Sequence, residues 1–153
     1  MNEAPGARLA AMPAPEAPCP CGQQSSGRKP HALAFGACCG RFLLPAAQAI
    51  RAVPVAPDAQ KLMRSRYTAY VLELGDYLLR TWHPDTRPAN LDLGEPVRWL
   101  GLEVRRHQVI DATHAEVEFV ARYRQQGRAV RMHERSRFVL EAGQWLYVDG
   151  DFL

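Results

Sequence analysis

The sequence predicts an α+β domain, with helices packed on a four-strand antiparallel sheet, preceded by a small four-cysteine knuckle. Apolar residues recur at helical spacing after Asp58, the period falls to two residues beyond Pro96, and all four cysteines lie between residues 19 and 39 of the 153-residue chain. A chain of this length can bury one ordinary hydrophobic core. Its formal net charge of +3 is only mildly basic and does not by itself imply a nucleic-acid partner.

The first 18 residues contain four prolines and six alanines but no continuous apolar stretch. Such a segment can form neither the core of a signal peptide nor a membrane span. It also buries too little surface to offset its ordering entropy. We therefore expect residues 1–18 to be a disordered tail, and the protein to be cytoplasmic with no membrane partner.

The cysteines form two short motifs, CPCG at 19–22 and CCG at 38–40. Disulfides are rare in the cytosol, whereas four thiolates from two segments match the tetrahedral requirement of structural zinc. A disulfide pair and four free thiols are the alternatives, and the clustering favours zinc over both. Segment 19–42 is thus predicted to hold one Zn²⁺ through four ligands, Cys19, Cys21, Cys38 and Cys39.

These two motifs resemble the SEC-C zinc motif found at the ends of bacterial secretion ATPases, which reads Cys-Pro-Cys-Gly and later Cys-Cys-Gly. Here the two halves are further apart than in that motif, so residues 23–37 look like an insertion. His31 lies within it and is a candidate substitute ligand, ranked below the cysteines. The resemblance implies zinc binding and contact with another protein.

Residues 43–57 contain three prolines and are predicted to be a linker that gives few contacts between the knuckle and a domain at 58–153. Asp58 is a good N-cap residue, and a helix should begin there and end at Gly75. Asp76 should cap a second short helix that ends before Pro84. Apolar residues of the first helix follow the i, i+3, i+4 rule at Leu62, Met63, Tyr67, Tyr70, Val71 and Leu74.

Strict alternation over 115–124 and 130–140 predicts a hairpin with its turn at 126–127. That register places Phe119 opposite Glu134 on an inner face, and it pairs opposite charges on the outer face. The other predicted pairs are Val117 with Ser136, Glu118 with Arg135 and Glu116 with Arg137.

A second turn at 142–143 should return the chain along the hairpin. An earlier strand is expected within 97–109, where Gly101 marks a bulge. The last strand is predicted to pair, in order, Trp145 with Leu140, Tyr147 with Phe138 and Asp149 with Ser136.

From about 58 to 151 this order resembles the cone-shaped nuclear transport factor 2-like fold, in which a curved sheet wraps N-terminal helices and often leaves a pocket. The sequence is also similar to the YchJ-like family of bacterial proteins. The similar strings are LMRSRYTAY (62–70), DYLLRTWHP (76–84), WLGL (99–102), VEFVARY (117–123), HERSRF (133–138) and QWLYVDG (144–150). This resemblance implies the fold and the zinc site but no activity.

Two carboxylates are predicted on the inner face, and burying them requires partners or protonation. The favoured interpretation is that Glu134 pairs with Arg64 or Arg66 and docks the helix. In the alternative, Glu134 and Asp149 act as an acid/base pair in a pocket, with His83 as a further catalytic candidate. The predicted pocket residues are Arg64, Tyr67, Trp82, Trp99, Phe119, Tyr123, Glu134, Ser136, Tyr147 and Asp149.

Three functions are compatible with these features. The first is a binding or adaptor protein whose zinc segment contacts a protein partner while the cone offers a second surface or pocket. The second is a small-molecule-binding protein or enzyme that uses the cone. The third and weakest is nucleic-acid binding through zinc and outer-face arginines, because no aromatic platform is interleaved with them.

Overall fold

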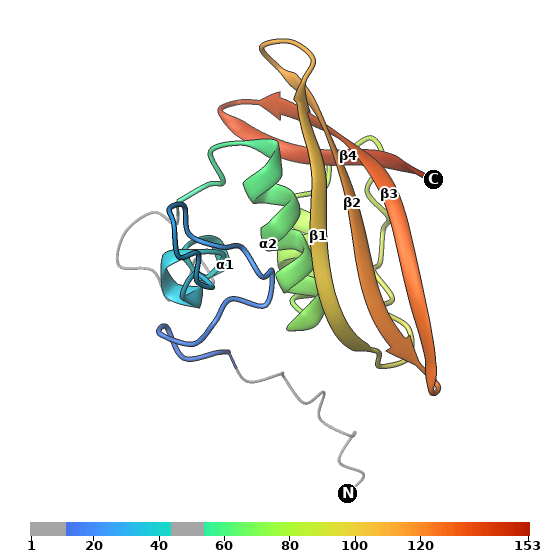
Figure 1. Cartoon of the computed structure of the whole chain (residues 1–153). Coiled ribbons are helices and arrows are strands. Elements are labelled where there is room, and N and C mark those ends of the chain that lie inside the picture. Colours follow the sequence, from blue (N-terminus) through green and yellow to red (C-terminus); the bar gives the residue numbers. More distant parts are fainter. Residues whose placement is uncertain (1–11, 44–53) are drawn as a thin grey trace, which may run out of the picture.

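The computed structural model describes residues 12–43 and 54–153, and it confirms the predicted α+β architecture (Figure 1). Parts of the predicted tail (1–11) and linker (44–53) lie outside the described residues. The elements in order are η1 (Phe35–Ala37), α1 (Gly40–Leu43), α2 (Ala59–Val71), α3 (Gly75–Arg80), β1 (Arg98–Val109), β2 (His114–Gln125), β3 (Arg128–Glu141) and β4 (Gln144–Phe152). None of the helices described is long and apolar enough to cross a membrane.

Helix α2 begins as predicted, since the Asp58 side chain accepts a hydrogen bond from the Lys61 amide at 2.7 Å. The prediction for its end was wrong. The chain leaves the helix after Val71 and turns through Glu73, whose φ is 58°, so that Gly75 already belongs to α3. Asp76 consequently lies in the first turn of α3 rather than at its cap.

The four strands form one antiparallel sheet in the order β1-β2-β3-β4. Both residues of each tight turn, at 126–127 and at 142–143, have positive φ, which is the type I′ geometry that suits a twisted hairpin. The β2/β3 register is the predicted one, with Phe119 opposite Glu134 and Val117 opposite Ser136. The bulge expected at Gly101 is also present, as a register shift between Trp99 and Gly101.

A second irregularity changes the prediction for β4. The register shifts between Arg137, which pairs with Asp149, and Phe138, which pairs with Tyr147. One extra residue, Val148, therefore reverses the alternation beyond it. Asp149 lies on the outer face, and its predicted position opposite Ser136 was wrong.

Helix α2 lies between the sheet on one side and the cysteine knuckle on the other (Figure 1). The knuckle residues Phe35 and Phe42 belong to the same buried cluster as Leu62 of α2 and Val117 of β2. The expectation of few contacts between knuckle and domain was therefore wrong, because the described residues share one hydrophobic core.

Part of the predicted tail is ordered. The Phe35 amide donates to the carbonyl of Ala17 at 2.7 Å, and the Gly36 amide donates to the carbonyl of Pro15 at 2.8 Å. These bonds tie residues 15–17 to the knuckle, so that part of the tail prediction was wrong.

Candidate functional site

The four cysteines converge in the knuckle. Their sulfur atoms all lie within 4.8 Å of one another, and the Cys21 and Cys38 sulfurs are 3.6 Å apart. Tetrahedral zinc with Zn–S bonds of about 2.3 Å sets sulfur atoms about 3.8 Å apart. All four side chains are buried, with exposed fractions of 5% or less. The donor set and its spacing thus fit a structural metal site.

The insertion between the two motifs folds back on itself and leaves the sulfurs together. Gln24 and Ala32 form an antiparallel bridge, and the Leu33 amide donates to the carbonyl of Gln23 at 2.9 Å. His31 sits in the exposed part of this loop, where its Nδ1 lies 2.9 Å from Ser25 Oγ. It is not part of the cysteine cluster, so the structure does not place it as a substitute ligand.

The sulfurs do not ionise independently. Hydrogen bonds from Cys21, and then from Cys38 and Cys39, lower the pKa of Cys19. The pKa of Cys38 and of Cys39 is raised, first by the hydrogen bond to Cys19 and further by burial. Such a set becomes four thiolates only when a nearby cation compensates the negative charge.

Helix α2 offers polar groups to the knuckle. The Arg64 Nη1 donates to the carbonyl of Cys21 at 3.2 Å, and Thr68 Oγ1 lies 3.9 Å from Cys19 Sγ. The prediction of Arg64 as a pocket residue was wrong, because α2 turns 100° per residue and thus points Arg64 and Arg66 to nearly opposite sides. Arg64 faces the knuckle, and Arg66 faces the sheet.

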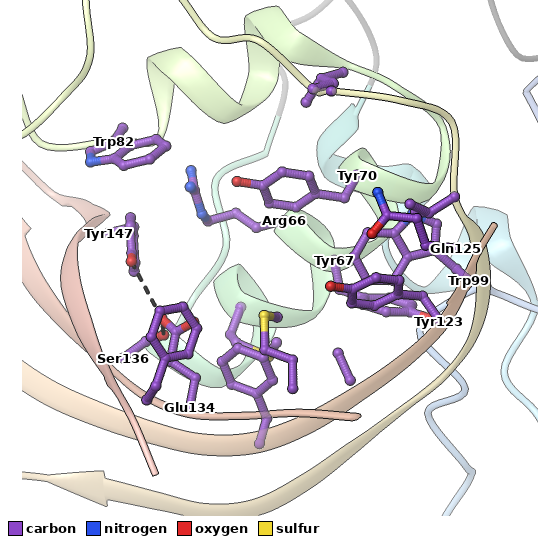
Figure 2. Close-up of a pocket in the computed structure, with 18 of the residues that line it drawn as sticks. Arg66, Tyr67, Tyr70, Trp82, Trp99, Tyr123, Gln125, Glu134, Ser136 and Tyr147 are labelled. Carbon is purple, nitrogen blue, oxygen red and sulfur yellow. Dashed lines mark hydrogen bonds between the residues drawn. The ribbon is translucent and has the colours of Figure 1, made fainter. Parts of the chain in front are cut away.

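A cavity of about 410 Å³ lies between α2 and the inner face of the sheet (Figure 2). Among the described residues, eight of the ten predicted pocket residues line it, namely Tyr67, Trp82, Trp99, Phe119, Tyr123, Glu134, Ser136 and Tyr147. Prediction from sequence missed Met63, Arg66, Tyr70, Met132 and Phe138, which also line it. Leu93 and Phe152 on its wall are 36% and 78% exposed, so the cavity opens to solvent on that side.

One end of the cavity is aromatic. The Trp99 ring lies 5.3 Å from both Tyr67 and Tyr123, and 6.2 Å from Tyr70, between ring centroids. The rings are inclined to one another, as edge-to-face packing favours. Burial raises the pKa of Tyr67 to about 12, so its hydroxyl stays protonated at neutral pH.

The opposite end holds a buried arginine. Arg66 is 6% exposed, and its Nη1 donates to the carbonyl of Leu78 at 2.7 Å and to Thr81 Oγ1 at 2.8 Å. Its guanidinium lies 4.6 Å from the Tyr147 ring centroid and 5.1 Å from that of Trp82. Burial lowers the pKa of Arg66, but an arginine remains charged in a protein.

Glu134 lies on the cavity wall near this arginine. Its Oε1 accepts hydrogen bonds from Ser136 Oγ at 2.9 Å and from the Tyr147 hydroxyl at 3.4 Å. Within the part of the chain that the structure describes, Glu134 forms no ion pair, so the prediction that it docks the helix through Arg64 or Arg66 was wrong.

The two other catalytic candidates lie outside the cavity. The Asp149 carboxylate accepts a hydrogen bond from Arg137 Nε at 2.5 Å on the outer face of the sheet. His83 lies against β4, where its amide donates to the Tyr147 carbonyl and its Nε2 is 2.8 Å from Glu141 Oε1. The predicted acid/base pair is therefore divided between the two faces of the sheet.

Three outer-face arginines of the hairpin, Arg122, Arg135 and Arg137, pair with acidic side chains. Arg137 also pairs with Asp151 at 2.7 Å, and Arg135 pairs with the same carboxylate at 3.5 Å. These contacts compensate part of the positive charge on the outer face and weaken the argument for nucleic-acid binding.

Fold and site together define an NTF2-like cone domain that carries a four-cysteine knuckle on the back of its long helix. The family model "YchJ, middle NTF2-like domain" matches residues 58–150. A "UPF0225 protein" of Polaromonas naphthalenivorans is 58% identical over 138 residues, covering 88% of this chain and 96% of the relative. The chain belongs to this YchJ family.

Two solved structures share the fold. A SEC-C motif containing protein from Rhodopseudomonas palustris is 31% identical with a TM-score of 0.68, covering 80% of this chain and 94% of that one. A SEC-C motif containing protein from Psychrobacter arcticus is 27% identical with a TM-score of 0.69, covering 86% of this chain and 80% of that one. Both are SEC-C proteins by description, in agreement with the resemblance of the cysteine motifs here.

Proposed function

We propose that this protein binds a small organic molecule in the cone cavity and that the knuckle holds one zinc ion that keeps α2 in place. The cavity carries this proposal. It measures about 410 Å³, is lined mainly by aromatic and apolar side chains, and includes a buried arginine and two carboxylates, Glu134 and the exposed Glu95. Ligand sites of proteins are concave and apolar, with a few polar groups that orient the ligand.

The knuckle has a structural role in this proposal. The four sulfurs are buried, and α2 contributes Arg64 and Thr68 to their surroundings. A metal bound there would hold the two cysteine motifs against the helix. The sequence favoured capture of a protein partner as the role of the knuckle. In this proposal its first role is instead to hold α2 in place.

A neutral fluorescent probe tests the cavity. N-phenyl-1-naphthylamine should bind one site per chain and shift the methyl ¹³C resonances of Met63 and Met132, which line the cavity. Met12 is 40% exposed and does not line it, so its resonance serves as the internal control. Lack of saturable binding, or equal shifts at all three methionines, would contradict the proposal.

Elemental analysis tests the metal. Protein prepared under reducing conditions without chelator should contain one zinc per chain, and replacing a single cysteine with serine should remove it. A metal-free protein with four titratable thiols would refute this part of the proposal without affecting the cavity.

A further inference from the structure

Three charged side chains line the cavity, namely Arg66, Glu134 and the exposed Glu95, and Arg66 pairs with neither carboxylate within 4.0 Å. Glu95 accepts a hydrogen bond from Gln126 at 2.7 Å. Arg66 and Glu134 lie at the same end, because the Arg66 guanidinium packs on the Tyr147 ring and the Tyr147 hydroxyl donates to Glu134. Arg66 is buried and Glu134 is half-buried. A buried charge without an opposite partner is costly, and a ligand that supplies a partner for Arg66 removes that cost.

Arg66 provides unused hydrogen-bond donors. A guanidinium has five N–H donors, and the hydrogen bonds recorded for Arg66 use only Nη1, toward Leu78 and Thr81. Figure 2 shows the guanidinium between Trp82, Tyr147 and Tyr70. A planar carboxylate is the group that such a fork binds best.

Glu134 imposes a second requirement. Its two hydrogen bonds both go to Oε1, and the carboxylate would repel a ligand that carried only an anion. A ligand with a hydroxyl or amine close to its own carboxylate would satisfy Arg66 and Glu134 together. The remaining space is bounded by Tyr67, Trp99 and Phe119, which suits an aromatic ring.

We propose, building on the proposed function, that the ligand is a small aromatic carboxylic acid with a hydrogen-bond donor beside its carboxylate. Arg66 binds the carboxylate, Glu134 accepts from the hydroxyl or amine, and the ring lies at the aromatic end around Trp99. Arg66 and Glu134 thereby determine specificity for the polar end of the ligand.

Four probes with one carbon skeleton separate these requirements, by displacement of N-phenyl-1-naphthylamine from the wild-type chain. They are L-3-phenyllactate, L-phenylalanine, 3-phenylpropanoate, which lacks the donor, and L-phenylalaninamide, which lacks the carboxylate. The better of the first two should displace the dye at concentrations about tenfold lower than the amide requires, since a hydrogen bond to a charged group is worth about that factor or more. It should also displace the dye better than 3-phenylpropanoate.

The variant Glu134→Gln should reduce the advantage conferred by the donor but leave the preference for acid over amide. The inference would be refuted if the acids and the amide displaced the dye equally well, or if none of the four probes displaced it. Saturable dye binding would still support the cavity as a ligand site in either case. Failure of the dye itself to bind would refute the proposed function and the inference with it.

Discussion

Replacing Glu134 with glutamine separates two roles for this carboxylate. If an arginine neutralised Glu134, the substitution would leave a buried cation unpaired and cost about 3 kcal/mol or more. In the structure the carboxylate instead accepts from two hydroxyls, on Ser136 and Tyr147, through Oε1. The glutamine carbonyl can occupy the same position and accept both bonds.

The cost can be worked from these two bonds. A hydrogen bond to a charged group contributes about 1.5–3 kcal/mol and a neutral one about 0.5–1.5 kcal/mol, so losing charge assistance costs about 1 kcal/mol per bond. The Tyr147 bond is long, at 3.4 Å, and contributes less than the Ser136 bond at 2.9 Å. An amide is also cheaper to bury than a carboxylate. The expected loss is about 1 kcal/mol, or about 3 °C in Tm.

Chemical denaturation of wild type, Glu134→Gln and the outer-face control Glu116→Gln measures this loss. Glu116 lies on the same hairpin opposite Arg137, and its substitution should change stability by less than about 0.5 kcal/mol. A double-mutant cycle of Glu134→Gln with Arg66→Lys should give a coupling energy below about 0.5 kcal/mol. A loss above about 3 kcal/mol for Glu134→Gln, together with strong coupling, would refute the assignment of unpaired charges.

Three further predictions concern packing, metal and pH. A Cβ at Gly150 would displace the Glu134 carboxylate and would lie 3.1 Å from the Arg135 carbonyl oxygen, which cannot turn away as a side chain can. Gly150→Ala should therefore destabilise the fold by about 1 kcal/mol. The helical control Gly75→Ala, where nothing lies within 4 Å, should stabilise it by about 0.4–1 kcal/mol. Equal denaturation midpoints for the two variants would contradict this packing. Removal of zinc by a chelator should lower the Tm of the whole domain by about 5 °C or more, as measured by calorimetry, because the knuckle and the domain share one hydrophobic core. An unchanged thermal transition would show that the knuckle folds independently. Burial raises the pKa of Tyr67 and Tyr77 to about 12, so the stability that their protonated forms contribute is complete below about pH 10 and is lost as pH rises through 12. Absorbance at 295 nm should then rise together with alkaline unfolding, and titration of both tyrosines near pH 10 in a folded protein would contradict the burial.

The fold and one hairpin register could be predicted because several local signals agree. Alternation, the turn at 126–127 and opposite charges such as Glu118 and Arg135 all require the same pairing, and the structure has it. The β4 register could not be predicted in this way. Alternation alone does not show that Val148 is an extra residue, because the bulge depends on how β4 meets β3 and not on a turn residue. That single residue moved Asp149 from the predicted inner face to the outer one.

The candidate site was predicted in part for a similar reason. The spacing of Met63, Tyr67 and Tyr70 marks the cavity face of α2, and Arg66 belongs to it by the same i+3 and i+4 rule. The same spacing excludes Arg64 from the cavity face, so the sequence does contain a signal that distinguishes the two arginines. Docking of the knuckle had no such signal, since Arg64 and Thr68 look like solvent-facing residues until the chain folds.

The position of α2 links the two sites. One side of this helix carries Arg64 and Thr68 toward the cysteines, and the other carries Arg66 and Tyr67 toward the cavity. If bound metal holds the helix in its ligand-binding position, loss of the metal weakens ligand affinity by some factor. Thermodynamic reciprocity then requires the ligand to strengthen metal retention by the same factor. The metal would thus act as an allosteric effector of ligand binding, and the ligand would in turn reduce loss of the metal. Helix α2, which contacts both sites, would carry this coupling.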